Sequence, residues 1–516
     1  MMNTLRPRFT LCLLLALFLP RLTRCEPTPN AAANRLGINL SGLVDWNTEH
    51  PFVDVFRLAR QWISQQPGQP WGKGPGLEVD TQGWVKRLEP GCFAETPILT
   101  GGHAPVGDYV CLYEGEGEIQ FGAHSQVVAR EPGRIVVHLD PRQAGTFVQL
   151  RQTNPEKPIR NVRVLMPGFE KTYRAEPFSP AFLNRWRGFN TLRFMDWMET
   201  NGSKQRDWAD RPRPEDATWS VKGAPVEVMV DLCNRMQANP WFCLPHLAGD
   251  DYVRQFAAVV RQRLDPSLKV YVEYSNEVWN GMFEQHRYAE AQGKRLGLGP
   301  KERPWEGAAQ FHARRSMEIF RAWEQGFGGR DRLVRVIAWQ AAGGAYWTDQ
   351  MLLSFEEAGK HCDALAIAPY LTFMPSPEAK GLRSDDVAHW SVEQVLDRVE
   401  TQALPECVGW MKEQKAVAAK YGLKLVAYEA GQHLVGVAGG ENNELLTQLL
   451  IAANHHPRMG AIYTEYLDAW RGQGGDLMCL FSSVSASSKW GSWGLLEGAD
   501  ETGSPKFDAV RAANGR

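Results

Sequence analysis

The feature that most constrains this chain's fold is an alternation of short apolar segments with longer amphipathic ones, running from residue 169 to the C-terminus. The short segments have the length and composition of buried strands, and the long ones carry apolar residues at helical spacing. Together with GINLSG (37–42), the predicted strands are TLRFMDW (191–197), PWFCLPH (240–246), VYVEYSNE (270–277), RVIAWQ (335–340), ALAIAPY (364–370), KLVAYEAG (424–431) and AIYTEYL (461–467). Eight such repeats predict an α/β fold, the (β/α)8 TIM barrel.

The main alternative to the barrel is an open, doubly wound sheet. That fold places a glycine-rich phosphate loop after its first strand, and GINLSG lacks the GxGxxG spacing. The predicted helices are VEVMVDLCNRMQ (226–237), DYVRQFAAVVRQRL (251–264), FHARRSMEIFRAWEQ (311–325), QMLLSFEEAG (350–359), VGWMKEQKAVAAKYG (408–422) and NELLTQLLIAANHH (443–456). They separate most of the predicted strands, as a barrel requires.

Residues 66–168 have a different texture from the rest of the chain. Short alternating runs such as DYVCLYEG and RIVVHL are separated by Gly, Pro and Asp turns, which predicts an antiparallel β-rich accessory module. Before it, residues 35–65 read as a strand followed by a helix over PFVDVFRLARQWIS, the first βα unit of the barrel. We therefore expect the module to interrupt the barrel, with residues 169–516 forming the remainder of the catalytic domain.

The N-terminus has the pattern of a signal peptide over residues 1–25. Two arginines precede the apolar run LCLLLALFL (11–19) and Pro20, and this run is too short for a spanning helix. We expect a secreted or periplasmic protein. Lipid attachment at Cys25 is disfavoured because Arg24 stands where such sites have a small residue. No later run of about 18 apolar residues predicts an integral membrane segment in the mature chain.

Charge and cysteine usage exclude several classes of function. Lys plus Arg number 57 and Asp plus Glu 59, so no global basic field favours nucleic acid as a partner. The nine cysteines form no CxxC pair and have no histidine at ligand spacing, so we predict no metal site. Disulfides between Cys92 and Cys111 or between Cys233 and Cys243 stay open. GxxxxGK[ST], HExxH and GxSxG are absent, and we predict no cofactor.

Two glutamates carry the strongest chemical signal. Glu277 ends the apolar strand YVEYSNE and Glu429 ends KLVAYE, which are the fourth and seventh predicted strands. Residues at these strand ends face each other across the mouth of a barrel. Paired carboxyls suit glycoside hydrolysis, in which one donates a proton and the other attacks, with retention when they stand about 5 to 5.5 Å apart. Burial would raise one pKa toward that of a useful acid.

SNE at 275–277, YEAG at 428–431 and the surrounding barrel resemble clan A of the glycoside hydrolases, which includes cellulase-like family 5 and xylosidase-like family 39. The resemblance implies Glu277 as acid/base, Asn276 as donor to the sugar 2-hydroxyl and Glu429 as nucleophile. It also implies that Arg193 keeps the nucleophile ionised and that Tyr370 orients it. Residue 368 is Ala, so the family 5 His-x-Tyr pattern is absent.

Three further residues complete the predicted sugar site. His246 ends PWFCLPH and could line it, while Trp279 and Trp470 could stack on pyranose faces. The predicted function is a secreted retaining hydrolase of a β-linked polysaccharide or oligosaccharide. An exo-acting β-glycosidase has the same carboxylates, and an inactive carbohydrate-binding protein is the alternative from another class.

Overall fold

The computed structural model of the 516-residue chain describes residues 35–142 and 145–515. The predicted signal peptide at 1–25, with Cys25, lies outside the described residues. Within the described part, no helix is both long enough and apolar enough to cross a membrane. The cysteines from Cys92 to Cys479 are all free thiols, so neither of the two disulfides that the spacing left open is formed.

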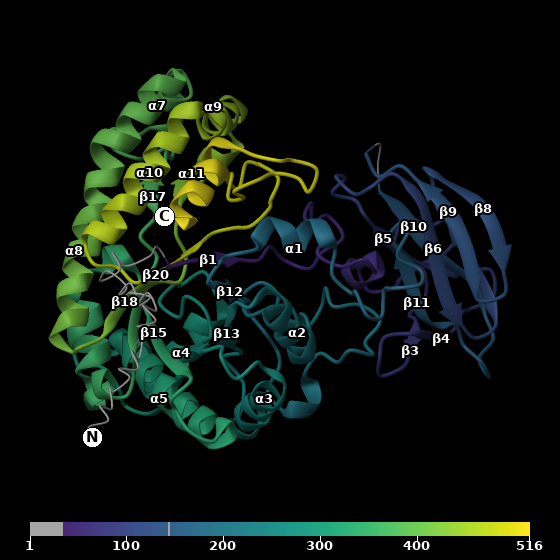
Figure 1. The fold of residues 1–516 in the computed structure, drawn as a ribbon, viewed down its shortest axis with the longest axis horizontal. Coiled ribbons are helices and arrows are strands. Elements are labelled where there is room, and N and C mark those ends of the chain that lie inside the picture. Colours follow the sequence, from purple (N-terminus) through teal and green to yellow (C-terminus); the bar gives the residue numbers. More distant parts are fainter. Residues whose placement is uncertain (1–34, 143–144, 516) are drawn as a thin grey trace, which may run out of the picture. The chain divides into compact units, whose positions relative to one another are not determined.

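Eight parallel strands close into a barrel, which confirms the predicted fold class (Figure 1). In order around the barrel they are β1 (Arg35–Asn39), β12 (Thr191–Arg193), β13 (Asn239–Leu244), β14 (Val270–Tyr274), β15 (Leu333–Ala338), β16 (Ala364–Ile367), β18 (Lys424–Ala427) and β20 (Leu477–Leu480). β20 pairs with both β18 and β1 and so closes the ring. The carboxyl ends of these strands meet at one mouth, where active sites of such barrels form.

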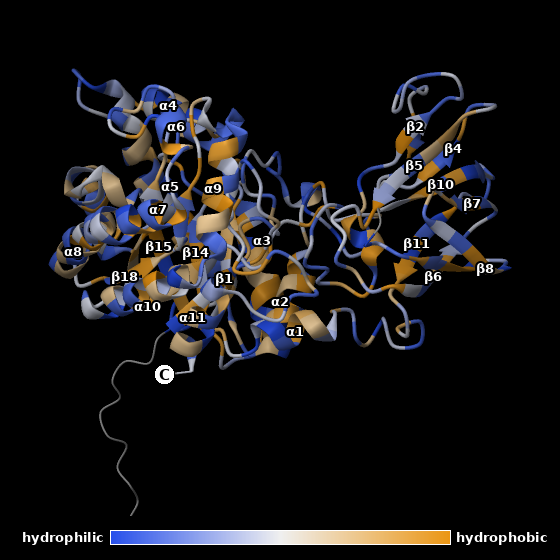
Figure 2. Cartoon of the chain, turned by 90° about the horizontal axis from the view of Figure 1, so that it is seen from above, coloured by the Kyte–Doolittle hydropathy of each residue, from blue (hydrophilic) through white to orange (hydrophobic). Residues whose placement is uncertain are grey.

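The helices cover the outside of the barrel. They are α1 (Pro180–Trp186), α2 (Val226–Met236), α3 (Asp250–Arg263), α4 (Glu284–Arg295), α5 (Gly307–Phe327), α6 (Ser384–Val387), α7 (Val392–Arg398), α8 (Leu404–Lys420), α9 (Glu444–His455), α10 (Pro457–Gly472) and α11 (Pro505–Asn514). In α2, buried Val226, Met229, Val230 and Cys233 follow the three- and four-residue spacing of one helix face. The barrel strands inside this layer of helices are largely buried on both faces, and β15 and β18 are mainly hydrophobic in Figure 2.

Side chains, not solvent, fill the lower part of the barrel. Trp241 and Tyr271 stack with ring centroids 5.2 Å apart, and Cys479 belongs to the same buried cluster. Gly37 on β1 leaves space for this packing, because an added Cβ would lie 2.5 Å from the Cys479 sulfur and 2.9 Å from the Thr191 carbonyl oxygen. The barrel is therefore a packed core below a polar mouth.

Two predictions of secondary structure are wrong. The segment 461–467 lies in α10, where Ile462, Tyr463, Tyr466 and Leu467 are buried at helical spacing after Pro457 at the first turn. The eighth strand is β20, the fully buried run LMCL that follows α10. The helix expected within 35–65 is also absent, since Val55–Leu58 forms only a 3-10 turn and Ile63–Gln65 is a strand of the β module.

The strands between β1 and β12 form two separate antiparallel sheets, which we call the β module (Figure 1). One sheet has the order β2 (Ile63–Gln65), β5 (Phe93–Ile98), β10 (Thr146–Thr153), β7 (Gly117–Phe121). The other has the order β11 (Arg160–Leu165), β6 (Gly107–Glu114), β9 (Arg134–Leu139), β8 (Ser125–Glu131). A short hairpin, β3 (Glu78–Val79) with β4 (Val85–Arg87), accompanies them. The β module has a hydrophobic cluster of its own, including Ala94, Ile119, Val148 and Leu150.

Candidate active site

Arg193 forms the centre of the polar mouth. It is the last residue of β12 and is fully buried. Its guanidinium donates to Glu429 Oε1 at 2.9 Å, Glu273 Oε2 at 3.0 Å, Asn276 Oδ1 at 2.9 Å and Asn39 Oδ1 at 3.0 Å. Asn39 and Glu273 lie in β1 and β14, and Asn276 and Glu429 lie two residues beyond the ends of β14 and β18, so the closed barrel brings together residues that lie up to 390 positions apart (429 − 39). A single buried cation thereby organises four strand ends.

Glu429 lies beside donors on both carboxyl oxygens. Arg193 donates to Oε1, and the Tyr370 hydroxyl donates to Oε2 at 3.0 Å. Burial raises the pKa of Glu429, whereas the Arg193 charge and the Tyr370 hydroxyl oppose that rise. These contacts favour the ionised, correctly oriented carboxylate that a nucleophile requires.

Glu277 has different surroundings. Oε2 accepts from the Asn280 amide at 2.9 Å, and Oε1 accepts from the Tyr428 hydroxyl at 3.3 Å, while Trp279 Nε1 donates to that hydroxyl at 3.2 Å. No cation contacts it among the described residues. Burial and the nearby charge of Glu429 raise the pKa of Glu277 to about 8. At neutral pH this carboxyl holds a proton.

The backbone around Glu277 is in an unusual conformation. Ser275 has φ +59° and Glu277 has φ +42°, both in the left-handed region that side-chain-bearing residues rarely adopt. A backbone keeps such a strained conformation only where the surrounding contacts hold it in place, and strained residues concentrate at functional sites. Here Asn276, between the two, is 2% exposed and is fixed by Arg193 and by its own bond from Nδ2 to Asn201 Oδ1 at 3.1 Å.

Glu273 is a site residue that the sequence reasoning missed. It lies on β14, four positions before Glu277 (277 − 273), is 1% exposed, and accepts from Arg193 and from Trp241 Nε1 at 2.8 Å. The available signal was a charged residue inside the apolar strand VYVEY, since an unpaired charge is almost never fully buried. Asn39 and Tyr428 were missed as well, and neither interrupts its strand in a way that suggests a site.

A further carboxyl, that of Asp196, lies near Glu429. Burial, together with the charge of Glu429, raises the pKa of Asp196 to about 7, while Arg193 opposes the rise. Asp196 follows β12 and makes no side-chain hydrogen bond within the described part of the chain. Its place near Glu429 makes it a candidate acceptor for sugar hydroxyls, which the sequence alone did not single out.

The aromatic predictions have different outcomes. Trp279 is partly buried and reaches Glu277 through the Tyr428 hydroxyl. Trp470 lies in α10, is 2% exposed and donates to the Asp476 carbonyl oxygen at 3.4 Å, so it packs the barrel wall and offers no open face to a sugar. His246 is 4% exposed, its ring meets Tyr288 edge-on at 5.4 Å, and burial lowers its pKa to about 4. A sugar-lining role for His246 stays a prediction.

A different aromatic group stands beside the nucleophile. Tyr370 contacts the rings of His433 at 5.6 Å and Trp493 at 5.8 Å, and those two rings are 4.9 Å apart. Trp493 is only partly buried. The three rings of Tyr370, His433 and Trp493 therefore lie next to Glu429, to which Tyr370 donates. They provide the flat apolar surface that was expected from Trp470.

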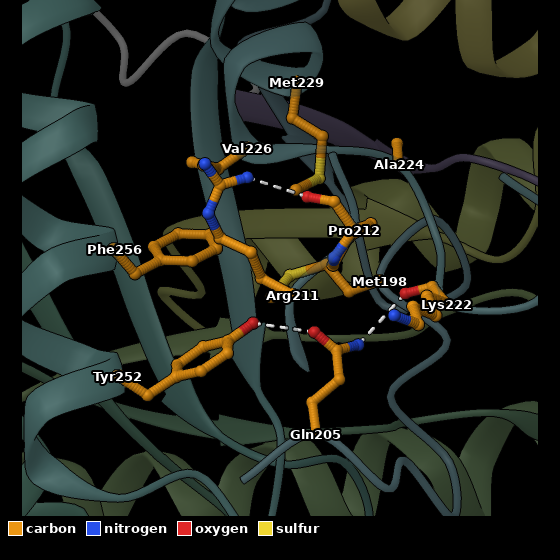
Figure 3. Close-up of a pocket in the computed structure, with 10 residues that line it drawn as sticks. All are labelled: Met198, Gln205, Arg211, Pro212, Lys222, Ala224, Val226, Met229, Tyr252 and Phe256. Carbon is orange, nitrogen blue, oxygen red and sulfur yellow. Dashed lines mark hydrogen bonds between the residues drawn. The ribbon is translucent and has the colours of Figure 1, made fainter. Parts of the chain in front are cut away.

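A small cavity elsewhere in the barrel wall is unsuited to a sugar. Figure 3 shows it closed by hydrogen bonds from the Tyr252 hydroxyl to Gln205 Oε1 (2.8 Å) and from Gln205 Nε2 to the Lys222 carbonyl oxygen (3.0 Å). Its volume is about 10 Å³, which is room for one water molecule. The carboxyl cluster at the strand ends is therefore the better candidate site.

No protein-family model matches the sequence, and no curated protein sequence is significantly similar to it. Several solved structures are similar to it at low identity. A 4-O-α-L-rhamnosyl-β-D-glucuronidase from Fusarium oxysporum is 11% identical with a TM-score of 0.39, over 64% of this chain and 62% of that one, less than two thirds of its length. The CBM22-1–GH10 modules of a Clostridium thermocellum endo-1,4-β-D-xylanase are 10% identical with a TM-score of 0.37, over 91% and 97%.

An endo-β-1,4-mannanase from Thermotoga petrophila is 11% identical with a TM-score of 0.26, over 65% of this chain and 72% of that one. These similarities concern the barrel fold. Membership of family 5 or family 39 stays a prediction, and the activity is argued below from the contacts of the site itself.

Proposed function

We propose that this protein is a retaining glycoside hydrolase that cleaves β-glycosidic bonds in a polysaccharide or oligosaccharide. The observation that carries the proposal is the unequal surroundings of its two carboxyls. Glu429 is bound by a cation and a phenol, whereas Glu277 is bound by neutral groups alone and has a pKa of about 8. Two carboxyls in such unequal environments suit the roles of nucleophile and acid.

In the first step, a Glu429 carboxylate oxygen attacks the anomeric carbon while the bond to the leaving oxygen breaks. Glu277 transfers its proton to that oxygen, so the aglycone departs as a neutral alcohol. Arg193 and Tyr370 keep Glu429 in place before the attack. The product of this step is a glycosyl ester on Glu429 and an ionised Glu277.

In the second step, the ionised Glu277 takes a proton from water, and the water oxygen attacks the anomeric carbon of the ester. Glu429 leaves as a carboxylate, to which Arg193 and Tyr370 again donate. Two displacements at one carbon restore the starting configuration. Glu277 must be protonated at the start, so activity should fall above about pH 8, and it should also fall at low pH as Glu429 takes up a proton.

One set of variants tests the two roles. Glu277→Ala should lose turnover on poor leaving groups, keep much of the first step on activated aryl β-glycosides, and yield a glycosyl azide of retained configuration with added azide. Glu429→Ala should form no ester and yield the inverted azide. Exposed Glu290, which has no side-chain hydrogen bond or ion pair in the described part of the chain, provides the matched control Glu290→Ala, with unchanged turnover.

The measurement is proton NMR of the product anomers alongside reducing-end release from a panel of β-linked polysaccharides. Normal turnover by both catalytic variants would refute the site, and an inverted wild-type product would refute the double displacement. Export is a separate proposal that rests on residues 1–25, and N-terminal sequencing of the mature protein tests it.

A further inference from the structure

One sheet of the β module presents an ordered row of polar and aromatic side chains on its outer surface. In the sheet β2-β5-β10-β7, Ala94, Ile119, Val148 and Leu150 point into the core. The residues that alternate with them point away from it. We call this outer surface the amide face; it consists of Trp71, Phe93, Glu95, Gln120, Gln149 and Arg151.

Strand register places the polar members of the amide face in one line. Glu95 pairs with Gln149, and Gln149 pairs with Gln120, so the line crosses three neighbouring strands. Gln149 Nε2 donates to Glu95 Oε2 at 2.8 Å, and Trp71 Nε1 donates to Glu95 Oε1 at 2.7 Å. Gln120 is held separately, by its bond to Glu118 Oε1 at 2.6 Å. These bonds fix the side chains before any ligand arrives, which lowers the entropic cost of binding.

The same face has hydrogen-bonding groups that remain open. The side-chain carbonyl oxygens of Gln120 and Gln149 accept no hydrogen bond from the described residues. The Arg151 guanidinium lies over the Phe93 ring at 3.9 Å and makes no hydrogen bond or ion pair within the same part of the chain. Trp71 is 52% exposed. The face thus combines unsatisfied acceptors, planar donors and flat ring surface.

This combination matches a neutral sugar chain. A pyranose has an apolar C–H face that stacks on rings, and an edge of hydroxyls that both donate and accept hydrogen bonds. Glu95 and Glu118, which holds Gln120, outnumber Arg151, so the face has no positive charge excess for a polyanion. An apolar protein partner would instead favour an apolar centre with few fixed amides.

We propose that the amide face binds a neutral β-linked polysaccharide chain. The choice of glycan rests on the proposed function, because the bound chain would be the substrate of the same protein. Binding there would hold the enzyme on its polymer between hydrolytic events. The binding itself requires no residue of the barrel mouth.

The test uses the full chain with Glu429→Gln, which should leave the polymer intact during the measurement. Affinity electrophoresis in gels containing xylan, mixed-linkage β-glucan, mannan or galactan should show retardation by at least one polymer. Trp71→Ala and the double variant Gln120→Ala/Gln149→Ala should each weaken that binding at least tenfold. The matched control is Gln126→Ala, at an exposed position of β8 in the other sheet, and it should bind within twofold of the parent.

Arg151→Lys provides a second test that leaves the packing nearly intact. It keeps the charge but removes the planar group, and it should also weaken binding. Retention of full affinity by all three face variants would overturn the proposal, and so would a chain that binds none of the four polymers. Hydrolysis by wild type without binding through the face refutes only this inference. Binding through the face without hydrolysis refutes only the proposed function.

Discussion

Replacing Glu277 by Gln should make the protein more stable at neutral pH, even though it removes the proposed acid. Burial and Glu429 raise the pKa of Glu277 from 4.5 to about 8. Between these values the native state holds a proton that the unfolded state has lost, so wild-type stability falls as pH rises from about 4.5 to 8. Gln is neutral at every pH and is free of this cost.

The size of the effect follows from the two pKa values. A pH of 7 is 2.5 units above the ordinary pKa of 4.5 and still below the native-state pKa of about 8. Each pH unit in this interval changes the free energy of unfolding by about 1.36 kcal/mol. Glu277→Gln should therefore gain up to about 3 kcal/mol at pH 7, little at pH 4.5, and as much as about 5 kcal/mol above pH 8. The gain should fall below these limits, because Glu277 is only partly buried and water reaches part of its side chain.

The assay is urea unfolding followed by tryptophan fluorescence at pH 4.5, 7 and 8.5, comparing wild type with Glu277→Gln. Glu290→Gln, at an exposed helical position, is the matched control and should show no pH-dependent gain. If the β module unfolds separately, the barrel transition is the one to compare. A Gln variant whose stability difference from wild type is the same at all three pH values would refute the elevated pKa and the acid role that rests on it.

Two further variants test the nucleophile and the barrel core. Tyr370→Phe keeps the ring but removes the hydroxyl that donates to Glu429. A lost bond to a charged group is worth about 1.5–3 kcal/mol, so kcat/KM should fall roughly 10- to 150-fold. The acidic limb of the pH profile should move to higher pH, because the hydroxyl no longer opposes the rise in the pKa of Glu429. Tyr109→Phe loses a buried bond in the β module and should leave that limb unchanged. Gly37→Ala should abolish folding or lower the melting temperature sharply, since the new methyl group would lie 2.5 Å from the Cys479 sulfur; near-wild-type melting would contradict this packing.

Seven of the eight predicted strand segments overlap a barrel strand, because their residues are mainly apolar and are bounded by turn signals. The error at 461–467 has a physical cause. AIYTEYL suits a strand by composition, but the whole span 457–472 carries apolar residues at helical spacing and begins with Pro457. The seven residues alone favour a strand, and only the longer span 457–472 shows the helical spacing.

The sequence by itself determined which residues end the strands, and in a closed barrel the strand ends meet at one mouth. Glu277, Asn276, Glu429, Arg193 and Tyr370 could therefore be named from local pattern and resemblance. In the structure Arg193 donates to Glu429 and Asn276, and Tyr370 donates to Glu429, while Glu277 lies close enough for the Glu429 charge to raise its pKa.

Only the tertiary structure decided what each carboxyl touches. Glu277 and Glu429 look alike in sequence, since each ends an apolar strand. Their surroundings differ because Arg193 and Tyr370, which oppose the rise in the pKa of Glu429, are brought to it from strand ends 236 and 59 residues away. A pKa responds to charges and donors within a few ångströms, and chain distance carries no information about them. The two roles therefore become distinct only when the barrel closes.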